Sequence, residues 1–512
     1  MTAAGGPNGR AAPGADGGPG ERPAVDAGVD AAADPAANAA ADCNPRAELR
    51  VWDDDACRTV HDATCRVLAE TGVEIRHPRA LELLRQAGAG VCDTRARLPR
   101  ELVDQALAAA PRAFVLKGRA PDGSLDRELA DGRTWFGTGP DCLYVADPDG
   151  GGRRRALLAD VERYAALCEN LPNIDFVMSM GLPEDADIER VDLAQLAAML
   201  AGTRKPIVVS SPFGGAPLRV MAEMADACGG AGSLACLAMS SPPLQLDEVC
   251  LDKLIVCGEL GVPAILAPSP SAGSTAPASI TAIVVVANAE VLAGLVVGQL
   301  AHAGAPFLYG AGVGVLNMQT MVESYRSPGV ALGNQACIDL ARWYGLPSWA
   351  YAGDSDSKLF DEQAAAESAM GAILGELCRA TLLHDVGYLE SGLQSSYEAL
   401  VLGDELAGYA RAFGAELPVS DEALALDEIM LAGPGGNHLG RPMTRANYRR
   451  FQRSGLLDQS AHDRWRAAGA TTLRERVAAR TQELLSGPPT FTLDETTRRR
   501  LRDLIAQAPS GR

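Results

Sequence analysis

The pattern of apolar and polar residues changes at about Gly132, where a two-part repeat begins. Each unit is a short apolar run that begins near a Pro or Gly, followed by a loop of small residues and a helical pattern. Eight such runs occur, at 135–147, 174–180, 205–211, 234–241, 263–269, 306–312, 347–353 and 381–391. The runs are continuously apolar, which is typical of parallel strands buried on both faces. They predict an α/β fold, a closed (β/α)8 TIM barrel, with an open doubly wound sheet as the alternative.

The regions on either side of the barrel, which we expect to span 131–440, have other patterns. Residues 1–42 are rich in Ala, Gly, Pro and Asp, which predicts a disordered tail without the apolar core of a signal peptide. Residues 43–130 have apolar positions at three- and four-residue spacing, which predicts a mostly helical region whose only strand-like piece is AFVLKGR. Residues 441–512 predict polar helices that pack outside the barrel mouth or against a partner.

Composition and charge exclude several classes of protein. The chain is 47% apolar, and the apolar segment 278–303 contains Asn288, Glu290 and Gln299, so we expect a buried helix and no membrane span. A formal charge of −19 argues against nucleic-acid binding. Residues 441–512 nevertheless carry 15 Arg and 7 acidic residues, either as a solvated surface or as a docking site for an acidic partner. Twelve Cys residues without a C-x-x-C motif predict reduced thiols in a cytoplasmic protein.

Candidate chemistry lies at the C-terminal ends of the predicted strands, where barrel enzymes place their functional groups. Hydroxyl groups follow most of the strands, whereas His384 and several acids follow the last two. His384 is either a structural residue or, with Tyr388 and Glu390 beside it, part of a site for a charged group. The six His residues have no metal-ligand spacing, and neither a G-x-S-x-G motif nor a phosphate-binding loop is present. We therefore assign no catalytic residue and no metal.

Four stretches together give the chain a family resemblance. They are 71–89 with 98–111, 271–300 with 305–312, 345–369, and 386–408 followed by 424–440. In these stretches the chain resembles the trimethylamine methyltransferase superfamily over about residues 45–485. The resemblance implies a barrel that binds a methylated amine and presents its methyl group to the Co(I) corrinoid (cobalamin) of a separate corrinoid protein. It also implies that no corrinoid is bound permanently and that the chain is a homo-oligomer.

One departure from the family narrows the expected substrate. Archetypal trimethylamine enzymes carry pyrrolysine in the loop around the sixth barrel run, and this chain has only standard residues there. The resemblance therefore implies a quaternary amine, with glycine betaine or a related betaine as the leading candidate. Another methylated amine, or a non-catalytic betaine-binding protein, is the alternative.

A trimethylammonium group is held by aromatic faces and nearby carboxylates. We expect two or three of the aromatic residues on or beside the strands to form this cage with Asp354 or Glu390; these are Phe136, Tyr144, Tyr309, Trp349, Tyr351 and Tyr388. For a betaine carboxylate the candidate donors are His384, Ser274 and Thr275. Many relatives have Arg at the position of Trp349, which leaves carnitine-like, choline-like and proline betaine substrates open.

The polar stretch AYAGDSDSK, residues 350–358, is expected at the end of the sixth barrel strand. We expect Asp354 to face the ligand there and Lys358 to pair with an acid as the next helix begins.

Overall fold

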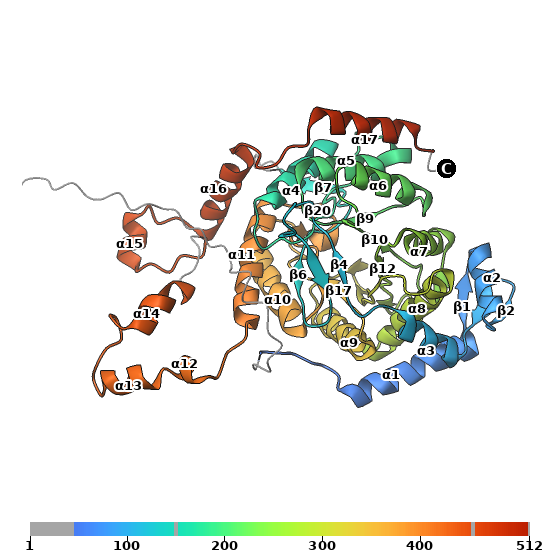
Figure 1. Cartoon of the computed structure of the whole chain (residues 1–512), viewed down its shortest axis with the longest axis horizontal. Coiled ribbons are helices and arrows are strands. Elements are labelled where there is room, and N and C mark those ends of the chain that lie inside the picture. Colours follow the sequence, from blue (N-terminus) through green and yellow to red (C-terminus); the bar gives the residue numbers. More distant parts are fainter. Residues whose placement is uncertain (1–45, 148–151, 452–455, 510–512) are drawn as a thin grey trace, which may run out of the picture. The chain divides into compact units, whose positions relative to one another are not determined.

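The eight apolar runs form a ring of parallel strands at the centre of the chain (Figure 1). The computed structural model describes residues 46–147, 152–451 and 456–509, so the predicted disordered tail lies outside the described residues. Each run contributes one paired segment: β6 (Trp135–Phe136), residues 176–177, β9 (Ile207–Ser210), β10 (Leu234–Ala238), β12 (Ala264–Leu266), β14 (Phe307–Tyr309), β17 (Trp349–Tyr351) and β18 (Leu382–His384). Each segment pairs in parallel with the next, and β18 pairs with β6. The ring therefore closes as a (β/α)8 barrel.

This strand order corrects the position of AYAGDSDSK. The strand Trp349–Tyr351 is seventh in the ring, not sixth, so the stretch lies in the loop after the seventh strand.

The first apolar run, at 135–147, is divided between the barrel and its mouth. Only Trp135–Phe136 joins the barrel, whereas β7 (Tyr144–Ala146) pairs with β8 (Arg153–Arg155) and β20 (Gln394–Ser395), and β20 pairs with β19 (Tyr388–Leu389). These short strands belong to the loops at the barrel mouth.

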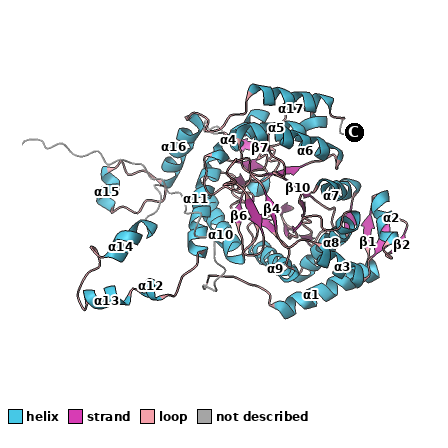
Figure 2. Cartoon of the chain, in the orientation of Figure 1, coloured by secondary structure: helices cyan, strands magenta, loops and turns pink. Residues whose placement is uncertain are grey.

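Eight helices follow the eight strands and surround them (Figure 2). In chain order they are α4 (Leu158–Glu169), α5 (Val191–Gly202), α6 (Ala216–Ala227), α7 (Glu248–Leu260), α8 (Ile280–Ala301), α9 (Pro328–Tyr344), α10 (Glu362–Cys378) and α11 (Tyr397–Gly414). Inside the ring, alternate strand residues such as Val208, Ile265 and Leu308 form an apolar core. Leu116 and Leu129, from the hairpin of β4 (Phe114–Leu116) and β5 (Arg127–Leu129), complete that core. Lys117 N donates to Gly232 O just before β10, so the hairpin closes the N-terminal end of the barrel.

The N-terminal region is mostly helical but contains a sheet that its sequence did not predict. Its helices are α1 (Asp54–Arg66), extended by a π-helical turn to Thr71, α2 (Pro78–Gln86) and α3 (Arg100–Ala109). Its sheet has the order β11-β1-β3-β2, with β1 (Val73–Ile75), β2 (Gly90–Cys92), β3 (Arg95–Arg97) and β11 (Gln245–Leu246). Strands of two or three residues are too short to leave an alternating pattern.

The apolar helix predicted at 278–303 is α8, a buried core helix. Among the described residues it is the one helix that is long and apolar enough to cross a membrane, and 72% of its most apolar window is buried. Its buried polar side chains, Asn288, Glu290 and Gln299, all have hydrogen-bond partners. Asn288 Nδ2 donates to Thr64 Oγ1 and Tyr344 Oη, and its Oδ1 accepts from Tyr309 Oη. Hydrogen bonds inside the protein thus explain why polar residues are tolerated in this helix.

Glu290 makes α8 a source of pH-dependent stability. The side chain is fully buried, and it accepts hydrogen bonds from the Ser240 hydroxyl and from Leu244 N. Burial raises the pKa of Glu290 from 4.5 to about 7, so the folded protein binds a proton that the unfolded chain releases. This contribution to stability is present below pH 4.5 and is lost as the pH rises through 7. Between pH 4.5 and 8, Glu290 should lower the free energy of unfolding of the wild type by up to about 3 kcal/mol. Glu290→Gln should lack this decrease. Urea unfolding of both proteins at the two pH values measures the difference. An equal pH slope in both proteins would contradict this.

The C-terminal region contains helices of two kinds. The helices α16 (Leu473–Ser486) and α17 (Glu495–Gln507) bury Val477, Leu501 and Leu504, and they pack against α11 and against α5 and α6, respectively. The intervening helices α12 (Asp421–Leu424), α13 (Leu426–Ala432), α14 (Pro442–Asn447) and α15 (His462–Ala467) contain no buried residue. The prediction of helices outside the barrel thus describes α16 and α17.

Candidate functional site

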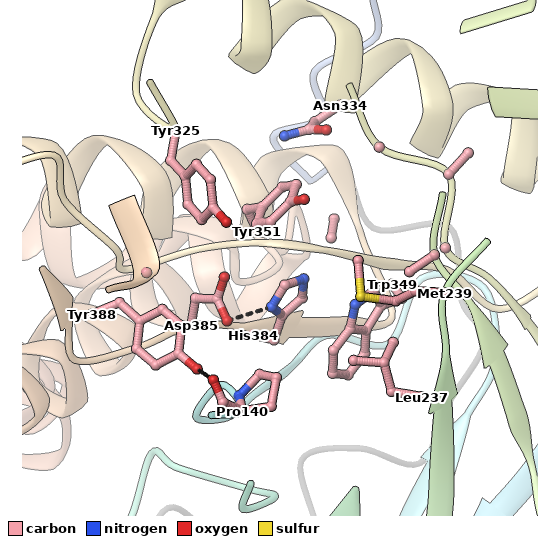
Figure 3. Close-up of a pocket in the computed structure, with 16 residues that line it drawn as sticks. Pro140, Leu237, Met239, Tyr325, Asn334, Trp349, Tyr351, His384, Asp385 and Tyr388 are labelled. Carbon is pink, nitrogen blue, oxygen red and sulfur yellow. Dashed lines mark hydrogen bonds and ion pairs between the residues drawn. The ribbon is translucent and has the colours of Figure 1, made fainter. Parts of the chain in front are cut away.

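A cavity of about 140 Å³ lies at the C-terminal ends of the barrel strands (Figure 3). Its walls come from the C-terminal parts of barrel strands, from the loops that follow them and from α9. They are formed by Pro140, Leu237, Met239, Ala267, Gly310, Ala311, Gly312, Tyr325, Asn334, Trp349, Ala350, Tyr351, His384, Asp385, Tyr388 and Gly392. Met239 is exposed, so the cavity reaches the surface at this side chain. This end of a barrel is where functional groups are expected.

Aromatic rings form much of the cavity wall. The His384 ring stacks on Trp349, with centroids 4.2 Å apart and an interplanar angle of 12°. Tyr351 lies 4.8 Å from His384 and 5.4 Å from Tyr325, tilted to both. Burial raises the pKa of the Tyr325, Tyr351 and Tyr388 hydroxyls, which keeps these rings neutral. Several neutral rings facing one space are suited to hold a cation.

Asp385 contributes a negative charge to this aromatic wall. Its Oδ1 lies 2.7 Å from His384 Nδ1, but the two groups are poorly aligned, and neither atom has a hydrogen-bond partner in the described structure. Asp385 is 3% exposed and has a φ of 71°, a left-handed conformation that is strained for most residues. A buried carboxylate held in this way retains the capacity to bind a positively charged ligand.

The backbone of residues 139–140 approaches the site closely. Gly139 has no side chain, and a Cβ atom there would collide with Asp385 Oδ1 and with the Tyr388 ring. The Tyr388 hydroxyl donates a hydrogen bond to Pro140 O. This contact fixes the Tyr388 ring beside the carboxylate.

Asp356, from the polar stretch after the seventh strand, positions the loop that carries Tyr325. Its carboxylate accepts hydrogen bonds from the Ser324 and Ser391 hydroxyls and, at 2.9 Å, from Tyr325 N. Burial raises the pKa of Asp356, but these hydrogen bonds outweigh burial and hold the pKa below its ordinary value. Asp356 therefore stays ionised and joins loops that follow the sixth and eighth strands.

Asp354 was predicted to face the ligand, but it does not line the cavity. Its side chain is fully buried and accepts two hydrogen bonds from the Arg326 guanidinium, one of them 2.8 Å from Nε to Oδ2. Burial raises its pKa to about 6, against the opposite effect of Arg326. Lys358 donates to the Asp356 backbone carbonyl at 2.7 Å rather than pairing with an acid. Both residues hold loop structure beside the site.

The remaining predicted site residues divide into two groups. The cavity brings together Trp349, Tyr351, His384 and Tyr388. The others do not line it: Glu390 pairs with Arg153, Tyr309 donates to Asn288, Phe136 lies below the Arg411 guanidinium, and Ser274 and Thr275 hydrogen bond within their own turn. Tyr144, another expected cage ring, lies below the Arg153 guanidinium. Phe136 and Tyr309 end strands with their side chains outside the barrel, where they pack against the helix layer.

Several lining residues were missed by the analysis of the sequence. Tyr325 and Asn334 lie well beyond the end of the sixth strand, so the rule that selects strand ends does not reach them. Asp385 directly follows the eighth strand and satisfied that rule, but it was not singled out as a site residue. The sequence did not show which of Asp385 and Asp354 faces the cavity. The residue that pairs with Asp354 is Arg326, which lies 28 residues away in the chain.

Comparisons with known proteins agree over most of the chain. The family model for trimethylamine methyltransferase (MTTB) matches residues 22–510. The glycine betaine methyltransferase of Desulfitobacterium hafniense (strain Y51) is 32% identical over 464 residues, which cover 89% of this chain and 96% of that protein. The trimethylamine methyltransferase of D. hafniense (strain DSM 10664 / DCB-2) is 28% identical over 465 residues, 89% of this chain and 93% of that protein. A solved structure, the monomethylamine methyltransferase of Methanosarcina barkeri, covers 90% of this chain and 89% of its own, with 13% identity and a TM-score of 0.49.

Proposed function

Because the chain belongs to the trimethylamine methyltransferase (MTTB) family, we propose that it transfers a methyl group from a quaternary amine to the Co(I) corrinoid of a partner protein. In this reaction one C–N bond breaks and its electron pair stays on nitrogen. The quaternary ammonium leaves as a neutral tertiary amine, and the methyl group passes to cobalt. The fixed positive charge of the substrate thus supplies the good leaving group.

The aromatic rings and the carboxylate that line the cavity support this function. A trimethylammonium group offers no hydrogen-bond donor, so a protein recognises it through aromatic faces and negative charge. The rings of Trp349, Tyr325, Tyr351 and Tyr388 face the same space as the Asp385 carboxylate. In the proposed complex the ammonium lies against Asp385 and the rings, with one methyl group directed toward the open side at Met239. The residues bind and orient the substrate, and the acceptor supplies the nucleophile.

Glycine betaine is the substrate that we propose first, since a relative 32% identical to this chain carries its name. Its carboxylate would depend on His384 and the Asn334 amide, because neither Lys nor Arg is present among the described residues that line the cavity. Choline, which has the same ammonium group without the carboxylate, is therefore the informative second substrate. We also propose a cytoplasmic location, supported by the eleven described Cys residues, all of which are free thiols.

The experiment mixes the purified chain with a reduced corrinoid protein and records the absorbance spectrum after each amine is added. A quaternary amine should convert Co(I) to methyl-Co(III), whereas trimethylamine should leave the spectrum unchanged. If glycine betaine and choline bind measurably but none of a panel of quaternary amines changes the spectrum, the chain is a binding protein and the proposal is wrong.

The partner is proposed to dock on exposed apolar side chains around the mouth. We call this set the apolar rim; it consists of Met239, Met318, Met321, Val322, Leu359 and Leu393, all in loops that follow barrel strands. Large apolar side chains gathered on one exposed surface mark interaction sites. The acceptor has to reach the cavity from this side, because the β4–β5 hairpin closes the other end of the barrel.

A double substitution in the rim tests this docking. We expect Met318→Asp with Met321→Asp to raise the KM for the corrinoid protein by on the order of tenfold or more, because two contact residues become charged. The affinity for the amine should not change. Val115→Asp is the matched control, since Val115 is 50% exposed at the opposite end of the barrel. An equal effect of both variants on the KM for the corrinoid protein would move the docking surface away from the rim.

A further inference from the structure

The segment 415–449, here called the arm, exposes more apolar surface than any packing within the chain accounts for. No residue from Ala415 to Arg449 is buried. Of the 23 exposed large apolar side chains among the described residues, nine lie in it. Among them are Leu417, Leu431 and Leu439, which are 75%, 72% and 84% exposed. Exposed apolar side chains on an ordinary surface are scattered singly. Their concentration in one short segment marks a surface that another molecule covers.

The two long helices that follow the arm, unlike the arm itself, pack on the barrel through apolar side chains. In α16 and α17, Val477, Leu501 and Leu504 are buried against the helix layer of the barrel. The arm helices α12, α13 and α14 have apolar side chains of similar size, yet bury none of them. Within the described part of a single copy, the apolar side chains of the arm are therefore not buried.

Charge is divided sharply along the arm. Residues 415–432 contain five acidic residues and neither Lys nor Arg, whereas residues 433–450 contain four Arg and no acidic residue. Among the described residues, no ion pair joins Asp421, Glu422, Asp427 or Glu428 to the arginines at 441, 445 and 449. A hydrogen bond from Met443 N to Glu428 Oε1, 2.9 Å long, does link the two halves. Glu416 pairs with Arg46, outside the arm. Within the described chain, the other four acids of the arm have no ion pair with these arginines and can pair with another molecule.

We propose that the arm binds the arm of a second copy of this chain, running antiparallel to it about a two-fold axis. In a two-fold interface, if residue i contacts residue j of the partner, residue j contacts residue i. In the antiparallel arrangement the acidic half of each arm faces the basic half of the other. In a parallel arrangement like charges would face each other. The exposed apolar side chains between the charges then supply the buried core of the interface. A partner of one charge sign would match only half of the arm.

Single substitutions test the apolar part of this interface in the full-length chain. Sedimentation should give the wild type a mass of at least twice the 53.4 kDa of one chain. Leu431→Asp should reduce that mass by half or more, with the circular dichroism and thermal unfolding of the barrel unchanged. The matched control is Ile188→Asp, since Ile188 is 63% exposed outside the arm, and it should keep the wild-type mass.

Charge reversal tests the charge pairing between the two arms independently. One variant reverses acids (Asp421→Lys, Glu422→Lys and Asp427→Lys), and the other reverses bases (Arg441→Glu, Arg445→Glu and Arg449→Glu). In each variant the two halves of the arm have net charges of the same sign, so neither variant alone should associate. An equimolar mixture should regain the wild-type mass, because every half then faces its opposite. A monomeric wild type, a wild-type mass retained by Leu431→Asp, or a mixture that fails to assemble would each overturn the proposal.

Discussion

Asp385→Asn is expected to lower kcat/KM for a quaternary amine by on the order of 100-fold. A carboxylate about 4–5 Å from an ammonium in a partly buried site contributes about 3–4 kcal/mol of attraction at an effective dielectric constant of about 20. Asn removes this charge at nearly constant volume. It also tolerates the φ of 71° found at this position, because Asn adopts left-handed conformations more readily than most residues. The loss should therefore report on charge rather than on strain, and the spectral assay measures it.

A neutral ligand provides the control for this prediction. In 3,3-dimethyl-1-butanol a tert-butyl group replaces the trimethylammonium group of choline, so the shape is kept and the charge is lost. The wild type should bind choline more tightly than this analogue, and Asp385→Asn should bind the two about equally. If the variant weakens binding of both ligands by the same factor, Asp385 acts through packing and the cation site lies elsewhere.

Arg326→Ala is expected to lower the free energy of unfolding by about 3–5 kcal/mol, because it leaves the fully buried Asp354 without its ion-pair partner. The folded-state pKa of Asp354 is already about 6, above its ordinary 3.8, and should rise further in the variant. A carboxyl with a raised folded pKa contributes stability at low pH that is lost as the pH rises through that value. Urea unfolding should therefore show a larger loss at pH 8 than at pH 5.

The double variant Arg326→Ala with Asp354→Ala separates the ion pair from general packing. Removing both partners should be less destabilising than the two single losses added together, since no charge is left buried. Lys358→Ala is a control in the same region, and it should change stability by less than about 0.5 kcal/mol because the side chain is exposed. Additive losses in the double variant would show that Asp354 and Arg326 are not coupled.

The barrel was predictable from the sequence because each strand is buried on both faces, and burial leaves a continuous apolar run. The direction of a side chain was not predictable, because such a run carries no alternation to fix its phase. Leu308 points into the barrel and Tyr309 out of it, whereas Trp349 and Tyr351 line the cavity. A shift of one residue along a strand would exchange the inward and outward positions. Only the structure of the barrel therefore shows which aromatic side chains line the cavity and which pack in the core.

The acids were harder to assign than the aromatic residues. The sequence places Asp354, Asp356 and Asp385 after adjacent strands, and their roles depend on groups far away in the chain. Arg326 neutralises Asp354, and hydroxyl and backbone donors hold Asp356 in a loop. Asp385 lines the cavity, with its Oδ1 2.7 Å from His384 Nδ1 and without a hydrogen bond. The arm is a similar case. Residues 415–440 were assigned to the predicted barrel span, and only the structure shows that they lie after the last barrel helix and bury no residue.

The most direct test of the central claim follows the methyl group itself. Glycine betaine and choline, each with three deuterated methyl groups on nitrogen, are incubated separately with the chain and a reduced corrinoid protein. We expect at least one of them to yield trideuteromethyl-cobalt and an equal amount of tertiary amine that keeps two labelled methyl groups. Bound ligand recovered with all three labelled methyl groups, and unlabelled cobalt in both reactions, would contradict it.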